Sequence, residues 1–140
     1  MTGPFDLERF VDAQESVFAD VLGELRRGRK ETHWMWFVFP QIEGLGASPT
    51  ARRFALRSLD EARAYLDHPL LGPRLRLCCE ILLGLEGRSA EQIFGYPDVM
   101  KLRSSLTLFS RAAEDAGTFE ALLDKYYGGE EDPRTLALLG

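Results

Sequence analysis

Residues 32–41 (THWMWFVFPQ) place both tryptophans of the chain beside a histidine and a glutamine. The imidazole of His33 ordinarily titrates near neutral pH, so it is suited to proton transfer. The amide of Gln41 can orient a sugar hydroxyl, and the flat indole of Trp34 or Trp36 can stack on a heteroaromatic ring. This segment therefore predicts one wall of a ligand site.

A second polar cluster, residues 96–105 (YPDVMKLRSS), predicts a place for an anion. On a helix, Lys101 and Ser105 share a face and Ser104 lies nearby. The start of that helix would present free backbone N–H groups and the positive end of the helix dipole, both of which attract a phosphate. We expect Arg52 to contribute a further positive charge.

The two clusters together give a candidate site with two kinds of residue. The catalytic candidates, for proton transfer or for orienting a hydroxyl group, are His33, Gln41 and Asp98. The candidates for binding a nucleotide-like small molecule are Trp34, Trp36, Arg52, Lys101, Ser104 and Ser105.

Each cluster also has a structural interpretation. Large aromatic side chains fill gaps between short helices, and a lone histidine is often a hydrogen-bonded structural residue. The aspartate and the two serines of the second cluster can cap a helix and permit a close helix crossing. We predict a divided outcome, in which Trp34, Phe37 and Val38 are mostly buried while Trp36 or His33 partly lines a cleft.

The overall charge argues against general binding of nucleic acid. The formal net charge is −5 and the pI is about 5.1, whereas neutralising phosphates requires a basic surface. Two local basic runs are exceptions, and we interpret them as solvated helix ends favoured by the helix dipole. They are Arg26, Arg27, Arg29 and Lys30, and then Arg52, Arg53 and Arg57.

The sequence has no common signature of a cofactor or metal site. It contains no P-loop, no glycine fingerprint of a dinucleotide-binding fold and no paired-carboxylate motif. Its only cysteines, Cys78 and Cys79, are adjacent, which suits neither a disulfide framework nor C-x-x-C zinc spacing. We therefore expect no cofactor and no metal, and we interpret both cysteines as helix-core residues.

Helical periodicity dominates the chain, and signals for helix starts recur along it. Only residues 37–39 suit a short extended piece. We predict an all-α fold in which residues 1–140 form one domain of about seven helices, several of them short. The predicted N-terminal caps are Asp6, Ser48, Ser58, Ser89, Asp98, Thr118 and Asp132, with capping boxes at Ser58 and Ser89.

The sequence also bears on localisation. No apolar run approaches the roughly 18 residues that span a bilayer. The N-terminal segment MTGPFDLERF carries acids where a signal peptide needs a basic start and an apolar run. We therefore expect a cytoplasmic protein that does not associate with a membrane.

Several segments carry a resemblance to a known family. PFDLERFVDAQ, HWMWFVFPQIEGLG, SLDEARAYLDHPLLGPRL, IFGYPDVMKLRSSLTLF and YYGGEEDPRT resemble the small bacterial family catalogued as domain of unknown function 1810. The similarity covers nearly the full chain, and it implies an all-helical fold of about this length without an established activity. Members are sometimes labelled calpastatin, but that inhibitor is disordered and polar, whereas this chain has the apolar content of a packed domain.

A more distant resemblance is to the NADAR family, helical proteins linked to ADP-ribose and N-glycosidic bond chemistry. Thr32-His33-Trp34 is similar to that family's motif of an acidic residue, a histidine and an aromatic residue. Phe94-Gly95 and the following helix are similar to its aromatic-glycine turn. The chain departs from the motif at Thr32, because the acidic residue Glu31 is displaced by one position and would point elsewhere on a helix.

Two functions stay open, and the sequence does not decide whether the protein is an enzyme. The first is a pocket for a nucleotide or an ADP-ribose-like ligand, with N-glycosidic bond chemistry as its implied reaction. The second is a non-enzymatic helical module that binds a protein partner through apolar side chains near Tyr126, Tyr127 and the C-terminal LALL segment.

Overall fold

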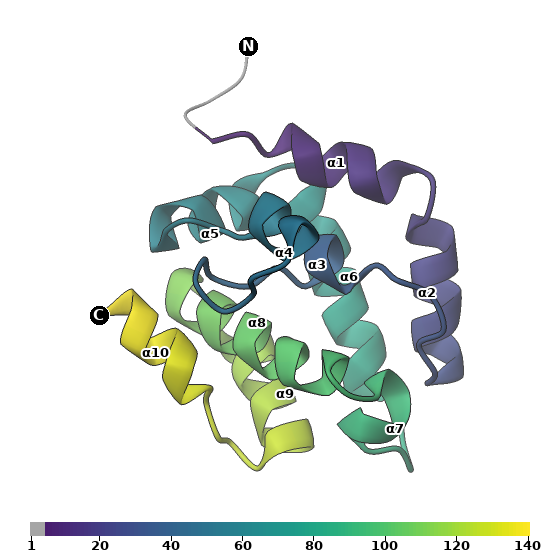
Figure 1. Ribbon diagram of the computed structural model, residues 1–140. Helices are drawn as coiled ribbons and strands as arrows, with labels where there is room; N and C mark the ends of the chain where they lie inside the picture. Colours follow the sequence, from purple (N-terminus) through teal and green to yellow (C-terminus); the bar gives the residue numbers. More distant parts are fainter. Residues whose placement is uncertain (1–4) are drawn as a thin grey trace.

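Over residues 5–140, the part of the chain that the computed structural model describes, the protein forms helices and no strand, so the all-α prediction is confirmed. There are ten helices in this range, rather than about seven (Figure 1). They are α1 (Glu8–Glu15), α2 (Phe18–Arg27), α3 (Met35–Val38), α4 (Pro49–Phe54), α5 (Leu59–Asp67), α6 (Leu71–Gly84), α7 (Ala90–Phe94), α8 (Asp98–Ala112), α9 (Gly117–Tyr127) and α10 (Pro133–Leu139).

The chain has more helices than predicted because some are very short and because the break between α1 and α2 has no sequence signal. Apolar residues continue at helical spacing from α1 into α2, so the periodicity does not reveal the interruption at Ser16 and Val17. α3 is a single turn of four residues, which is too short to show a period. The extended piece suggested for residues 37–39 is wrong for Phe37 and Val38, because both belong to α3.

Several predicted helix starts are confirmed by side-chain hydrogen bonds. Ser48 caps α4 by accepting from the backbone N–H of Ala51, and Pro49 occupies the first helical position. Ser89 and Gln92 form a complete capping box at the start of α7. Asp132 caps α10. The residue types at these positions satisfy backbone groups that have no partner within the helix.

The cap at Ser58 is also confirmed, but its capping box and three other predicted caps are wrong. Ser58 accepts from Glu61 N–H as expected, but the Glu61 carboxylate accepts from the N–H of Arg57 and from the side chain of Arg9. α8 begins at Asp98, whose side chain makes no cap hydrogen bond. α1 and α9 follow Leu7 and Ala116, which also supply no side-chain cap, in place of the predicted Asp6 and Thr118.

Helices α5, α6, α8 and α9 pack against one another at the centre of the molecule. The most deeply placed is α8, in which residues 104–109 are all buried. Figure 1 shows α1 and α2 around the outside of this group and α10 along the flank of α8. The first turns of α8 therefore lie between the segment that follows α3 and the start of α10.

Two sequence interpretations outside the site also have an outcome. Cys78 and Cys79 are free and fully buried on α6, as expected of core residues. Within residues 5–140, none of the helices combines the length and the apolar character that a membrane span requires. Residues 1–4, which belong to the N-terminal segment used for the localisation prediction, lie outside the described residues.

Candidate functional site

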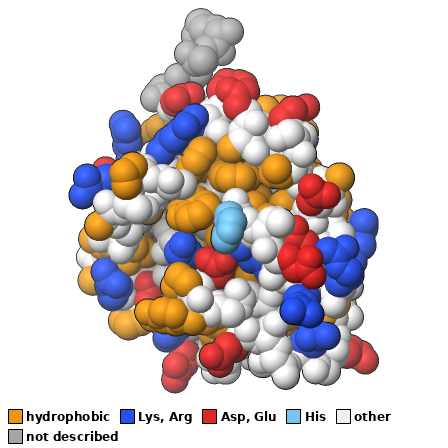
Figure 2. Space-filling model, turned by 45° about the vertical axis from the view of Figure 1, so that its right-hand side comes forward, with side chains coloured by type: hydrophobic (Ala, Val, Ile, Leu, Met, Phe, Trp, Pro, Cys, Tyr) orange, Lys and Arg blue, Asp and Glu red, His pale blue; other side chains and the backbone are white. Residues whose placement is uncertain are grey.

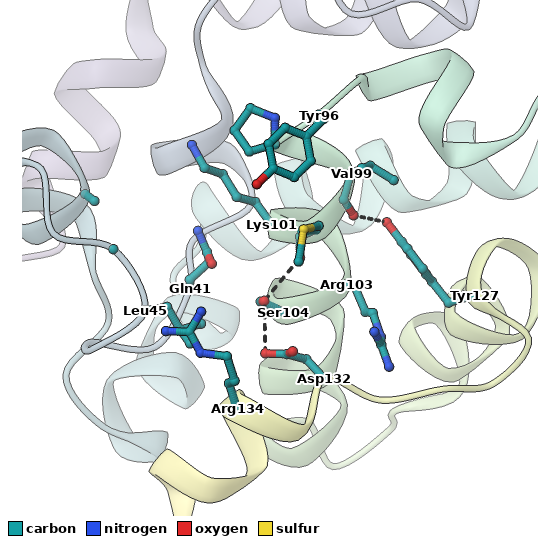
Figure 3. Close-up of a pocket in the computed structure, with 14 residues that line it drawn as sticks. Gln41, Leu45, Tyr96, Val99, Lys101, Arg103, Ser104, Tyr127, Asp132 and Arg134 are labelled. Atoms are coloured by element: carbon teal, nitrogen blue, oxygen red, sulfur yellow. Dashed lines mark hydrogen bonds between the residues drawn. The ribbon is translucent and has the colours of Figure 1, made fainter.

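A cavity of about 380 Å³ opens where separate parts of the chain meet. Its walls are the segment between α3 and α4, the turn before α8 with the first turns of α8, the end of α9 and the start of α10 (Figure 3). The volume falls within the range of roughly 300 to 1,000 Å³ that is usual for small-molecule sites.

Three of the predicted site residues line this cavity, namely Gln41, Lys101 and Ser104. About sixty positions of sequence separate the glutamine from the other two, so only the packing of α3 near α8 brings them together. Trp36 supports the same wall from outside the cavity, because Lys101 Nζ lies 4.8 Å from the centroid of its ring.

The cavity has two distinct ends. Figure 3 shows Tyr96 and Lys101 at one end and Asp132 and Arg134 at the other, with Gln41 and Leu45 along one side. Tyr96 is 78% exposed and Met100 is 57% exposed, so the rim carries large apolar side chains that protein packing leaves uncovered. Such uncovered side chains beside polar groups are typical of binding sites.

The polar groups at the Asp132 end of the cavity are held in fixed positions by hydrogen bonds. Ser104 Oγ lies 3.1 Å from both Met100 O and Asp132 Oδ2, and it can donate its proton to either. Asp132 Oδ2 also accepts from the N–H of Thr135 at 3.0 Å and from its hydroxyl at 2.6 Å. These bonds tie α10 to α8 and orient the Asp132 carboxylate.

Lys101 belongs to a chain of charges at the start of α8. Its Nζ lies 3.6 Å from Asp98 Oδ1, and the other oxygen of Asp98 pairs with Lys30 Nζ at 2.8 Å. The side chains of Lys30 and Asp98 are only 5% and 18% exposed. Asp98 therefore joins the loop after α2 to α8 and positions Lys101, and it does not line the cavity.

Trp34 is a core residue and is only 1% exposed. Its indole N–H donates to Glu24, whose carboxylate also accepts from the N–H groups of Glu31 and Thr32 and from the Thr32 hydroxyl. Burial alone would raise the pKa of Glu24, but these hydrogen bonds to the charged form lower it from 4.5 to about 2. The predicted burial of Trp34 and Val38 is confirmed, whereas Phe37 is only half-buried.

The remaining predicted site residues lie elsewhere. His33 is exposed in the loop before α3 and does not line the cavity. Arg52 lines a different cavity between α1 and α4. Ser105 is fully buried in the core, and its Oγ has no hydrogen-bond partner among the described residues. This burial agrees with a structural role for Ser105.

The structure adds residues that sequence reasoning did not select. The cavity is also lined by Tyr96, Arg103, Asp132 and Arg134. The Asp132-Pro133 pair marked a helix start, but nothing local indicated that this helix would return to the first turns of α8. In residues 5–140, no group of three or more histidine, cysteine or acidic side chains is arranged to hold a metal ion.

Comparisons with known proteins place the chain in a family. No curated protein matches it at a significant level. The chain is similar to the crystal structure of the conserved hypothetical protein Rv1873 from Mycobacterium tuberculosis, with 60% sequence identity, a TM-score of 0.96 and coverage of 98% of each chain. The family model described as "Protein of unknown function (DUF1810)" matches residues 4–139. Nearly the whole length of the chain therefore belongs to the DUF1810 family, as the resemblance of its tryptophan-rich and KLRSS segments had indicated.

Proposed function

We propose that the cavity between the α3–α4 segment and α8 binds a small molecule that joins a flat ring to an anionic group, as nucleotides and ADP-ribose do. The observation that carries this proposal is the meeting of Gln41, Lys101 and Ser104 around one cavity of about 380 Å³.

The charge of the lining favours an anion. The described residues of the lining include three cations, Lys101, Arg103 and Arg134, and one carboxylate, that of Asp132. Outside the lining, Lys101 also lies near Asp98, and Arg103 pairs with Glu130 at 3.5 Å. Arg103 is held by hydrogen bonds to the carbonyl oxygens of Glu130 and Glu131. Arg134 makes no ion pair within residues 5–140. Lys101 and Arg134 are thus the cations that a bound phosphate would meet.

The uncovered rim supports the flat part of the ligand. The ring of Tyr96 and the thioether of Met100 are both exposed and both belong to the lining. Aromatic rings and methionine side chains contact planar ligands favourably. In this arrangement the ring of the ligand lies near Tyr96, and the anionic group reaches Lys101 or, at the other end, Arg134.

Hydrogen-bonding groups along the side of the cavity and at its Asp132 end suit a sugar. Gln41 offers both a donor and an acceptor, and Asp132 Oδ1 accepts no hydrogen bond from the residues described. Hydrolysis of a glycosidic bond commonly uses two carboxyl groups. Asp132 is the one carboxylate among the lining residues, so we place N-glycosidic bond chemistry second to binding, with Asp132 as its candidate residue.

A thermal-shift panel tests the proposal. It contains NAD, ADP-ribose, nucleotides and modified nucleosides, and a ligand at ten times its Kd should add about 1.4 kcal/mol to the free energy of unfolding. Lys101→Gln and Arg134→Gln should each reduce the shift, whereas Arg26→Gln, which removes an exposed arginine on α2, should not. Absence of a shift across the panel, or a shift that both pocket variants retain, would overturn the proposal.

The alternative function, a protein-interaction module, has one supporting observation at the same place. Leu138 on α10 is 48% exposed and packs over Gly44, in the segment between α3 and α4 that also supplies the cavity residues Gln41 and Leu45. The tyrosines expected to be exposed, Tyr126 and Tyr127, are half-buried, and their hydroxyls donate to backbone carbonyls. Leu138→Ser, which leaves Tyr96, Lys101 and Arg134 in place, should abolish protein binding but preserve ligand binding if both functions exist.

A further inference from the structure

A second cavity, of about 330 Å³, lies between the start of α1 and the connection from α4 to α5. Four arginines and two acids line it, which leaves a formal excess of two positive charges. The lining residues are Phe5, Asp6, Arg9, Arg52, Arg53, Arg57 and Glu61. We propose that this arginine cluster is a binding site for a small polyvalent oxyanion of the pyrophosphate class, separate from the cavity beside α8.

The carboxylate of Glu61 is fully engaged and does not neutralise Arg52, Arg53 or Arg57. Glu61 is 2% exposed, and its Oε2 pairs with Arg9 at 3.1 Å. Its Oε1 accepts the backbone N–H of Arg57 at 2.8 Å. Both oxygens of the Glu61 carboxylate therefore already have partners. The guanidinium groups of the other three arginines receive no counter-charge from Glu61.

Arg9 is the positioning residue of this cluster. Its guanidinium donates to the carbonyl oxygens of Arg53 at 2.8 Å and of Ala55 at 2.9 Å, in addition to the ion pair with Glu61. It also donates to Asp6 O. These bonds hold α1 against the α4–α5 connection, and they use the donors of Arg9 that would otherwise reach an anion.

Three guanidinium groups remain for a ligand, those of Arg52, Arg53 and Arg57. None of them makes an ion pair within residues 5–140, and the only other acid at the cavity is Asp6, which is exposed. Arg53 lies 5.2 Å over the ring of Phe54, which limits the freedom of its side chain. Planar guanidinium groups bind phosphate oxygens in pairs, so three of them can hold a diphosphate.

A solvated helix end does not account for the whole cluster. Arg52 and Arg53 occupy the last turn of α4, where the helix dipole favours a cation. Arg57, however, lies three residues beyond the end of this helix and lines the same cavity. The helix dipole therefore explains Arg52 and Arg53 but not Arg57. We attribute the presence of Arg57 at the same cavity to an anion that all three arginines bind.

The limited extent of the cluster selects a small ligand over a nucleic acid. A duplex or a long single strand requires a continuous basic face. Figure 2 shows acidic and basic side chains interspersed over the face that it presents, without a large area of positive charge. A cavity of about 330 Å³ that is lined by three arginines without ion pairs in residues 5–140 instead matches a compact, highly charged anion.

The test compares two triple variants that remove the same charge. Arg52→Gln/Arg53→Gln/Arg57→Gln changes the cluster, and Arg26→Gln/Arg27→Gln/Arg29→Gln changes exposed arginines at and after the end of α2. Calorimetric titration with pyrophosphate at constant ionic strength should show one saturable site in the wild type. The Kd should rise at least tenfold in the cluster variant and stay within twofold of the wild-type value in the control variant. Far-ultraviolet circular dichroism confirms that both variants are folded.

Further measurements distinguish a free anion from a lipid headgroup, and the arginine cluster from the cavity beside α8. Lys101→Gln should leave pyrophosphate binding unchanged, because this lysine belongs to the cavity beside α8. Orthophosphate should bind more weakly than pyrophosphate, and binding to phosphoinositide vesicles but not to free pyrophosphate would assign the site to a lipid headgroup. The proposal is overturned if the wild type shows no saturable binding of either kind, if both triple variants lose affinity equally, or if Lys101→Gln abolishes binding.

Discussion

The indole N–H of Trp34 donates a hydrogen bond of 3.0 Å to Oε1 of Glu24, and neither side chain is more than 2% exposed. Glu24 comes from α2, whereas Trp34 immediately precedes α3. The carboxylate thereby fixes the loop that leads into the tryptophan-rich segment. Because this segment continues to Gln41 at the cavity wall, the buried contact also sets the position of one side of the candidate site.

The charge of Glu24 should make the stability of the protein depend on pH. Its pKa in the folded protein is about 2, below the ordinary 4.5, so its contribution is present above about pH 4.5 and is lost as the pH falls toward 2. Because a pKa difference of one corresponds to about 1.4 kcal/mol, the contribution is on the order of 3 to 4 kcal/mol. Urea unfolding between pH 7 and pH 2.5 should show this loss in the wild type and a smaller one in Glu24→Gln. Glu31→Gln, which changes an exposed carboxyl in the same loop, should behave as the wild type. The same pH dependence in Glu24→Gln would contradict the assignment.

Trp34→Ala should cost about 3 to 5 kcal/mol of stability. The substitution leaves a large cavity in the core and removes one of the hydrogen bonds to the Glu24 carboxylate. The neighbouring Trp36 is only half-buried, so Trp36→Ala serves as the matched comparison and should cost clearly less. Chemical denaturation followed by circular dichroism measures both. Equal losses in the two variants would mean that the burial of Trp34 does not decide its contribution.

Asp98 should contribute to stability through its ion pair with Lys30. Asp98→Asn removes the partner of an almost fully buried lysine and should cost about 2 to 3 kcal/mol. Asp60→Asn is the control, because Asp60 also lies in the first turn of a helix but pairs with Arg63 at the surface, where the side chains are 78% and 52% exposed. Its effect should stay below about 1 kcal/mol. The difference in the free energy of unfolding between the two variants tests the prediction, and similar small effects would contradict it.

Two glycines of α6 should respond to alanine in opposite ways. A Cβ at Gly72 would lie 2.0 Å from the backbone oxygen of Leu66, so Gly72→Ala must displace backbone and should cost about 3 kcal/mol or more. A Cβ at Gly84 would meet no atom within 4 Å, so Gly84→Ala should stabilise the helix by roughly 0.5 to 1 kcal/mol. Thermal unfolding of both variants measures the two signs. Stabilisation by Gly72→Ala would show that α5 and α6 do not approach closely.

Local chemistry made several parts of the fold predictable. The capping box at Ser89 and the Ser48-Pro49 start were correct because each depends on atoms no more than four residues apart. Helical periodicity identified the all-α fold for the same reason. The predicted cap at Asp98 was wrong, because its carboxylate forms an ion pair with Lys30. Lys30 lies almost seventy positions earlier in the sequence, so no local pattern indicated this partner.

The candidate site required the tertiary structure. Sequence reasoning selected Gln41, Lys101 and Ser104 by residue type, but it gave the same weight to Ser105, which faces the core, and to Arg52, which lines the other cavity. Adjacent residues on a helix point in directions about 100° apart, so residue type alone cannot say which of them faces a neighbour.

By itself, the amino-acid sequence determined the helical fold, several of the helix starts and the family, because these depend on short-range periodicity, capping groups and characteristic motifs. Only the tertiary structure decided that α10 returns to α8, that Asp132 and Arg134 complete one cavity, and that Arg9 gathers the arginines of another. Those contacts join residues that are 28 to 46 positions apart. They depend on how the helices pack as rigid bodies, which no local pattern of residues specifies.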